Sequence, residues 1–154
     1  METQHRFAVE RADGARILIV AARYYKDVVD ALVTGAVRAV ADAGATSDVV
    51  DIPGAFEAPA AIALAARSGK YDGYIALGCV IRGETSHYDY VCGESARGLM
   101  DLSIQKHLPI GYGILTVENE AQAIARADPA TRDKGGEAAR ACLAVLALSK
   151  KFPS

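Results

Sequence analysis

The sequence contains no tryptophan, few aromatic residues and no cluster of positive charge. Its formal net charge is −2, and no run of lysine or arginine is longer than Lys150-Lys151. A nucleic-acid-binding surface needs several clustered cations, so we do not expect nucleic acid as a partner. The longest uncharged apolar stretches, 58–66 and 142–148, are much shorter than the ~18–20 residues that cross a bilayer. We therefore expect no membrane partner either.

Cysteine is also scarce. Cys79, Cys92 and Cys142 form no CxxC pair and no cluster with histidine at zinc spacing, and the polar start of the chain lacks the apolar segment of a secretory signal. An odd number of cysteines is typical of free thiols in a reducing compartment, so we expect a cytoplasmic protein without a metal. With 51% hydrophobic residues, the 154-residue chain predicts one globular domain over 16–154, after an N-terminal arm at 1–15.

Apolar runs of strand length alternate with segments of helical period along the whole chain. Strands separated by helices favour right-handed βαβ crossovers. The sequence therefore predicts a three-layer α/β/α sandwich, flavodoxin-like, with a central four-stranded parallel sheet and a possible extra N-terminal edge strand. The strands are predicted at 16–22, 47–52, 73–81 and 109–116, and the helices at 27–43, 58–67, 86–106, 118–127 and 135–149.

Ligands of open parallel sheets bind beyond the carboxyl ends of the strands, and three such ends here are rich in polar and aromatic side chains. They lie at 23–26, 53–57 and 82–90. In the third, Ser86 and Asp89 are spaced as in a capping box at the start of a helix. The free amides of a helix N-terminus can bind an anion. Ordinary capping without a ligand explains the same residues equally well.

Three side chains at these strand ends each have a functional and a structural interpretation. His87 lies beside the possible anion site and could transfer protons at neutral pH, or it could be an ordinary surface or core histidine. Tyr24 could stack on a planar heterocycle or cover the core. Glu57 could accept hydrogen bonds from a polyol or cap its short helix.

Two segments carry a resemblance to a known family. They are PGAFE at 53–57 and GCVIRGETSHYDYV at 78–91, supported by LTVEN at 115–119 and DKG at 133–135. On these residues the chain resembles the lumazine synthase family, which acts at the penultimate step of riboflavin biosynthesis. The resemblance implies a transferase without cofactor. It would condense 5-amino-6-(D-ribitylamino)uracil with 3,4-dihydroxy-2-butanone 4-phosphate to 6,7-dimethyl-8-ribityllumazine, phosphate and water.

The resemblance also implies roles for single residues at matching positions. His87 would be the proton-transfer residue. The residues implied for ribitylaminouracil are Tyr24, Ala55, Phe56, Glu57, Cys79, Val80, Ile81 and Tyr112. The residues implied for the phosphate of the second substrate are Glu84, Thr85 and Arg126, with Lys134 near the same site. In the family, the counterparts of Tyr112 and Arg126 come from the neighbouring subunit, which implies a homo-oligomer with sites at subunit interfaces.

Some positions depart from the usual family pattern. Tyr25 stands where asparagine is usual, and Val117 stands where threonine is usual. The loop at 128–133 lacks the Gly-x-Lys-x-Gly turn of capsid-forming members, which predicts a free homopentamer.

A non-catalytic flavin- or lumazine-binding protein, or a regulatory paralogue of the same fold, is the alternative, because a fold does not determine a function. Arg126 together with His87 favours an enzyme, since a pure binder of a planar ring needs neither. A phosphoryl-accepting receiver is disfavoured, because Arg23 and Arg82 lie where it needs acidic residues.

Overall fold

The structure, a computed structural model, describes residues 10–154. Its single sheet consists of four parallel strands: β1 (Arg16–Ala22), β2 (Thr46–Ile52), β3 (Gly73–Ile81) and β4 (Ile110–Val117). The order across the sheet is β2-β1-β3-β4. The helices are α1 (Lys26–Asp42), α2 (Ala58–Ala66), α3 (His87–Gln105), α4 (Glu120–Ala127) and α5 (Lys134–Lys151), with a single 3₁₀ turn at Ala55–Glu57 before α2.

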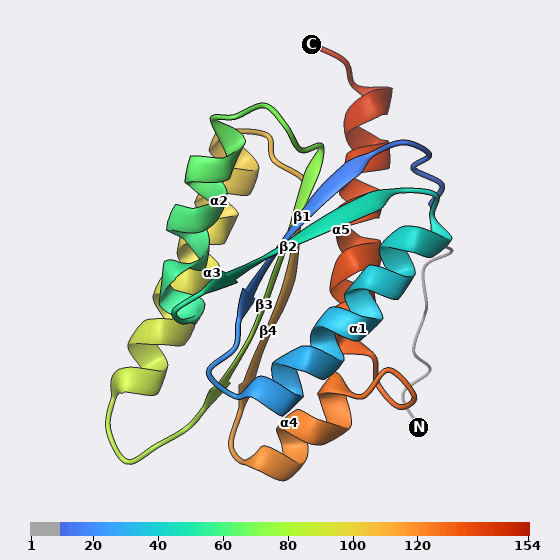
Figure 1. Cartoon of the computed structure of the whole chain (residues 1–154). Helices are drawn as coiled ribbons and strands as arrows, with labels where there is room; N and C mark the ends of the chain where they lie inside the picture. The colour runs from blue at the N-terminus through green and yellow to red at the C-terminus, as the bar shows by residue number, and fades with distance from the viewer. Residues whose placement is uncertain (1–9) are drawn as a thin grey trace.

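The helices form two layers around the sheet. α2 and α3 cover one face, and α1, α4 and α5 cover the other (Figure 1). The three-layer, flavodoxin-like prediction with four parallel strands is confirmed. The predicted ends of the helices and strands lie within two residues of the observed ends. The 3₁₀ turn was not predicted, because three residues are too few to show a helical period.

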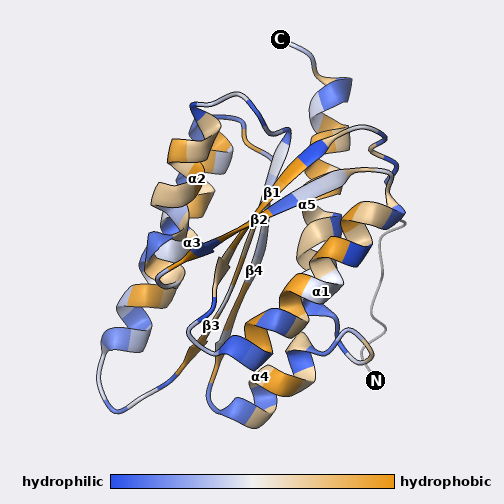
Figure 2. Cartoon of the chain, in the orientation of Figure 1, coloured by the Kyte–Doolittle hydropathy of each residue, from blue (hydrophilic) through white to orange (hydrophobic). Residues whose placement is uncertain are grey.

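The two central strands, β1 and β3, are buried on both sides. Each side of the sheet packs on its own apolar cluster, one under α1, α4 and α5 and the other under α2 and α3. Figure 2 shows the central strands as largely hydrophobic and the edge strand β2 as mixed. β2 is mostly exposed, since no further strand pairs with its outer edge within residues 10–154.

Two apolar residues of the long helices lie outside the core. Ile104 of α3 is 64% exposed, and Val37 of α1 lies at the rim. Each follows a buried leucine, Leu32 or Leu99, by five residues. Five residues rotate an α-helix by about 140° from the starting direction, which turns the side chain away from the sheet.

The end of the predicted N-terminal arm packs on the domain. The Ala12 amide donates to the carbonyl of Ala43 at 2.9 Å, and the Gly14 amide donates to that of Gly44 at 3.1 Å. Residues 1–9 of the arm, and with them the possible extra edge strand, lie outside the described residues. Over residues 10–154, no helix combines the length and the apolar character needed to cross a membrane.

α5 approaches α1 closely at Gly135. A Cβ atom at Gly135 would lie 2.7 Å from the carbonyl carbon of Leu32 and closer still to its oxygen. Backbone atoms cannot yield as a flexible side chain can. The first turn of α5 therefore requires glycine at this position.

Replacing Gly135 by alanine should therefore destabilise the protein. Gly135→Ala is expected to lower the free energy of unfolding by about 1–3 kcal/mol through overpacking. The matched control is Gly93→Ala, because nothing lies within 4 Å of a Cβ atom at Gly93 in α3. That control should leave stability unchanged or raise it by up to about 1 kcal/mol through helix propensity. Urea unfolding at one protein concentration measures both; equal midpoints for Gly135→Ala and wild type would contradict the expectation.

Candidate active site

A cavity of about 590 Å³ opens at the carboxyl ends of β1, β2 and β3, where ligands of parallel sheets bind. We call it the ring cavity. It collects residues from the turn after β1, the segment between β2 and α2, the end of β3 and the first turns of α3. Eight residues implied by the family resemblance line it: Tyr24, Ala55, Phe56, Glu57, Cys79, Val80, Ile81 and His87. Tyr25, Pro53, Gly54, Tyr90 and Val91 line it as well.

Two aromatic side chains present open faces at this cavity. Tyr24 is 79% exposed and Phe56 is also exposed. Tyr24 therefore does not cover the core, and its ring is free to stack on a planar heterocycle. The Tyr25 ring contacts the Tyr24 ring edge to face, with centroids 5.0 Å apart. Burial raises the pKa of the Tyr25 phenol, which keeps that hydroxyl neutral.

The Glu57 carboxylate is not used as a helix cap. Glu57 occupies the N-cap position of α2, but its side chain makes no capping hydrogen bond. A Cβ atom at Gly54 would lie 3.2 Å from Glu57 Oε2, so the carboxylate lies over the turn at the cavity wall. An exposed carboxylate accepts several hydrogen bonds, which suits the hydroxyls of a polyol.

The end of β3 offers backbone groups to the cavity. The ladder between β1 and β3 ends at Leu77, whereas β3 continues to pair with β4 as far as Ile81. Residues 79–81 thus have a strand on one side only. Their amide and carbonyl groups on the β1 side are available to hydrogen-bond the edge of a ligand ring.

Arg82 anchors the turn between β3 and α3. Its Nε donates to both carboxylate oxygens of Glu118, at 3.0 and 3.2 Å, and its Nη1 lies 3.5 Å from Asp89. Its guanidinium also lies over the Tyr88 ring, 4.2 Å from the centroid. These contacts join the ends of β3 and β4 to the first turn of α3, directly beside His87.

The capping box predicted for Ser86 and Asp89 is wrong. The Ser86 side chain makes no capping hydrogen bond. Instead, the hydroxyl of Thr85 accepts a hydrogen bond from the His87 amide at 3.3 Å, and Asp89 pairs with Arg82. A guanidinium attracts the Asp89 carboxylate more strongly than a neutral amide does. Thr85 and Glu84 are exposed on this turn, outside the lining of the ring cavity.

A second cavity, of about 650 Å³, follows β4 between α4 and α5. We call it the basic groove, since it is lined by Arg126, Lys134 and Arg140 and by one carboxylate, that of Glu137. Lys134 pairs with Glu137 at 2.8 Å. Arg126 donates from Nη1 to the carbonyl of Gln122 at 3.1 Å and has no ion-pair partner within residues 10–154. An uncompensated guanidinium of this kind suits a phosphate.

The two cavities are separate in one chain. Tyr112 lines the basic groove together with Arg126, and the groove shares no lining residue with the ring cavity. A single chain therefore does not bring these two residues to His87. The assignment of Tyr112 and Arg126 to a neighbour's site stays a prediction.

Among the ring-cavity residues to which the sequence interpretation gave no role are two tyrosines, Tyr25 and Tyr90. Tyr25 was treated only as a departure from a family pattern. Tyr90 follows His87 by three residues at the start of α3, and residues three apart share one face of a helix. That spacing is the signal that could have placed Tyr90 beside His87.

Comparison with known proteins identifies the family. A family model described as 6,7-dimethyl-8-ribityllumazine synthase matches residues 14–150. The chain belongs to this family. A protein of that name from Methylobacterium radiotolerans is 60% identical over 137 residues, covering 89% of this chain and 84% of its own. Proteins of the same name are 56% identical in Bartonella henselae, covering 94% of both chains, and 57% identical in Novosphingobium aromaticivorans, covering 90% of this chain and 99% of its own. The lumazine synthase resemblance is confirmed.

The thiol of Cys79 in the ring cavity is a poor nucleophile. Burial raises the pKa of Cys79 to about 11, and that of Cys142 to about 12. At pH 8, three units below the Cys79 value, only about one Cys79 thiol in a thousand is ionised. Because the thiolate is the nucleophile, Cys79 takes no covalent part in chemistry near neutral pH.

Alkylation at pH 8 should accordingly proceed first at Cys92, which is less buried than the other two cysteines. Peptide mass spectrometry after timed iodoacetamide treatment of the folded protein measures the order. In urea all three thiols should react at similar rates, which is the control. Labelling of folded Cys79 as fast as Cys92 would show that its environment is more open than the structure indicates.

Proposed function

We propose that the protein catalyses the reaction named by its family: condensation of 5-amino-6-(D-ribitylamino)uracil with 3,4-dihydroxy-2-butanone 4-phosphate. The products are 6,7-dimethyl-8-ribityllumazine, phosphate and water, and the step is the penultimate one of riboflavin biosynthesis. The observation that carries the proposal is the ring cavity, where eight residues from four separate segments meet in a chain that matches the family over 14–150.

The ring cavity accommodates the pyrimidine substrate in one orientation. Tyr24 stacks on the ring, and the unpaired side of the backbone at 79–81 hydrogen-bonds the ring edge. The ribityl chain then lies along 55–57, where the Glu57 carboxylate accepts hydrogen bonds from its hydroxyls. The open Tyr24 ring, the end of the β1–β3 ladder and the absence of a capping bond at Glu57 each support this placement.

The reaction requires positioning of the two substrates and proton transfer. The amine adds to the ketone, water leaves, phosphate is eliminated, and the ring closes with loss of a second water. Both substrates already carry the reacting groups, so holding them together supplies much of the rate, with effective molarities of up to ~10⁵–10⁸ M in favourable cases. His87, exposed at the start of α3 beside the cavity, is the proton-transfer residue.

The phosphate requires positive charge that the ring cavity lacks. No lysine or arginine is among the residues that line the ring cavity. Thr85 and Glu84 provide a hydroxyl and backbone amides at the start of α3, whereas the cations lie in the basic groove. We infer that the basic groove of one copy faces the start of α3 of the next, so that Arg126 and Lys134 reach the phosphate from the neighbouring subunit.

Such a contact joins two different surfaces of the chain, and it gives a closed ring where the rotation between neighbours closes. We propose a homopentamer. The loop at 128–133 is closed by its own bonds. The Asp133 amide donates to the Asp128 carbonyl at 3.0 Å, and the Thr131 hydroxyl donates to the Ala125 carbonyl at 2.5 Å. This loop replaces the glycine turn of capsid-forming members, which supports a free pentamer. The cytoplasmic location stays a prediction from the odd number of cysteines.

Purified protein mixed with both substrates should generate the absorbance of the lumazine product, and His87→Ala should reduce kcat without abolishing it. Loss of a positioned proton-transfer group typically costs about 10²–10⁴-fold, while positioning remains. Steady-state rates at saturating substrates measure the effect. No product from wild type would overturn the proposed function, and an unchanged kcat in His87→Ala would remove His87 from its role.

Subunits with different defects should restore each other's activity. Arg126→Ala is expected to raise KM for the phosphorylated substrate, because a guanidinium–phosphate contact is lost. In mixed oligomers that contain both Arg126→Ala and His87→Ala chains, some sites receive an intact His87 from one chain and an intact Arg126 from its neighbour. These mixed oligomers should be more active than oligomers of either variant alone, which serve as the controls. Mixed oligomers without recovered activity would contradict a shared site.

Light scattering of the wild-type protein should give about five chains per particle. A megadalton particle would contradict a free pentamer.

A further inference from the structure

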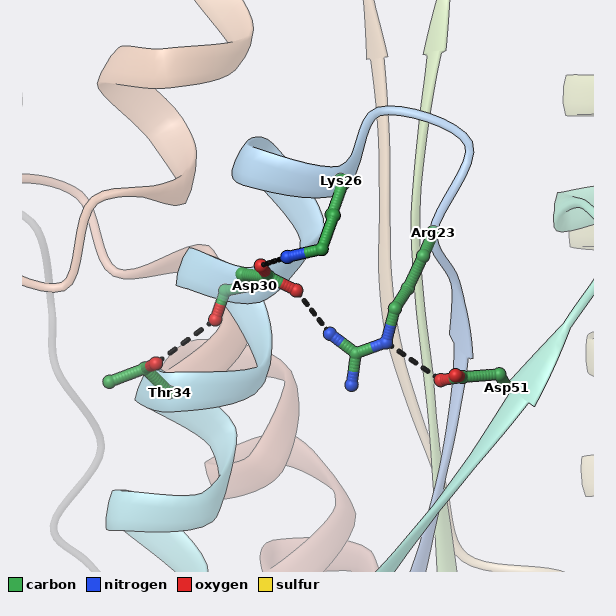
Figure 3. Close-up of polar contacts among 5 residues, drawn as sticks. All are labelled: Arg23, Lys26, Asp30, Thr34 and Asp51. Carbon is green, nitrogen blue, oxygen red and sulfur yellow. Dashed lines mark hydrogen bonds and ion pairs between the residues drawn. The ribbon is translucent and has the colours of Figure 1, made fainter.

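One guanidinium, that of the residue before Tyr24, connects three segments of the chain (Figure 3). Arg23, the residue after β1, donates from Nε to Oδ1 of Asp51 in β2 at 2.7 Å and from Nη1 to Asp30 of α1. The second oxygen of Asp30 accepts a hydrogen bond from Lys26 Nζ at 2.6 Å. β2, the turn after β1 and the first turns of α1 are thereby held together through a single side chain.

These bonds lie where the backbone pairing of β1 and β2 stops. The last paired residues of this ladder are Ala22 and Ile52. Beyond them, the segment after β1 continues to Tyr24 and the segment after β2 continues to the turn at 54–57. Both segments line the ring cavity. Arg23 reaches back to Asp51 at this point of separation. Asp51 pairs with Ala21 inside the ladder, so the Arg23–Asp51 bond ties the first residue after β1 back to β2.

The Tyr24 ring depends on its own backbone for its orientation. The ring is exposed, and the aromatic ring it contacts is that of Tyr25, which belongs to the same turn. Tyr25 occupies the N-cap position of α1 without a side-chain capping bond, so the turn lacks the usual anchor at a helix start. The bonds of Arg23 to α1 and to β2 take the place of that anchor.

The Arg23 group stays charged at any pH the enzyme meets. Hydrogen bonding to Asp51 is the main cause that raises the pKa of Arg23, and Asp30 adds to it. The Lys26 hydrogen bond lowers the pKa of Asp30 in turn. Lysine could not substitute fully, because an ammonium lacks the planar fork that bonds two carboxylates in fixed directions.

We propose that Arg23 is a positioning residue for the pyrimidine substrate, which holds Tyr24 and the turn at 54–57 at the separation that the substrate ring and its ribityl chain require. The proposal rests on the proposed function and deepens it. Arg23 itself touches no substrate. Its removal should act on the pyrimidine side of the site and leave the phosphate side, which uses the start of α3 and the basic groove, unaffected.

The test compares Arg23→Ala and Arg23→Lys with Arg97→Ala. Arg97 also bonds two carboxylates, Glu94 at 2.6 Å and Asp101 at 3.1 Å, but all three lie on α3. Arg23→Ala should raise both KM for the ribitylaminouracil and Kd for the lumazine product, the latter from fluorescence titration, by about tenfold, since small misplacements of a binding group are costly. KM for the phosphorylated ketone should stay within about twofold. The KM and Kd values of Arg23→Lys should lie between those of wild type and Arg23→Ala. Those of Arg97→Ala should match wild type.

A double-mutant cycle separates positioning from general destabilisation. If Arg23 acts through Tyr24, Arg23→Ala should raise Kd for the product much less in a Tyr24→Ala background than in wild type. Should Arg23→Ala fold poorly, Asp51→Asn, which keeps the shape and removes one partner charge, takes its place in the same assays.

Three results overturn the proposal: unchanged Kd and KM for the pyrimidine compounds, equal loss toward both substrates, or additive effects of Arg23→Ala and Tyr24→Ala. A wild-type protein that neither binds nor forms the lumazine product overturns the proposed function instead. The two failures are thus distinguishable.

Discussion

The site depends on one constraint of the sheet: parallel strands direct all their carboxyl ends to the same edge. That edge brings together the turn after β1, the segment after β2 and the end of β3, which are distant in sequence. The ladders stop at different residues, Leu77 for β1 with β3 and Ile81 for β3 with β4. The cavity lies at this uneven end of the sheet, where backbone groups are no longer used by neighbouring strands.

Charge is distributed unevenly between the ring cavity and the basic groove. The ring cavity combines open aromatic faces, backbone groups and the Glu57 carboxylate, which suits a neutral, polyhydroxylated heterocycle. The basic groove combines cations of α4 and α5, which suits a phosphate. Keeping the cations away from the aromatic cavity leaves Glu57 free to accept hydrogen bonds from hydroxyls instead of forming an ion pair. A reaction that joins a sugar-bearing ring to a small phosphate ester needs both environments.

Much of the fold could be predicted from the sequence, because strongly apolar runs end at clear breaks such as Pro53-Gly54 and Gly44. Most residues of the ring cavity could be named through the family resemblance, which rests on contiguous motifs at strand ends, whereas Tyr25 and Tyr90 were missed. Details that depend on a side-chain direction could not be predicted. Thr85 caps α3 in place of Ser86, and no sequence pattern distinguishes two adjacent hydroxyls. The Arg23 bonds to Asp30 and Asp51 depend on the register of β1 against β2, which no local pattern reports.

The exposure of the Tyr24 side chain determines which substitutions the fold tolerates at this position. A side chain that is 79% exposed adds almost nothing to the apolar core, so folding places little demand on its identity. In the stacking role proposed for Tyr24, the demand on this position comes instead from the flat surface that it offers to a ligand. The scaffold therefore places little restriction on exchange among the aromatic residues, and in the proposed role the choice among them would adjust affinity for the heterocycle independently of stability.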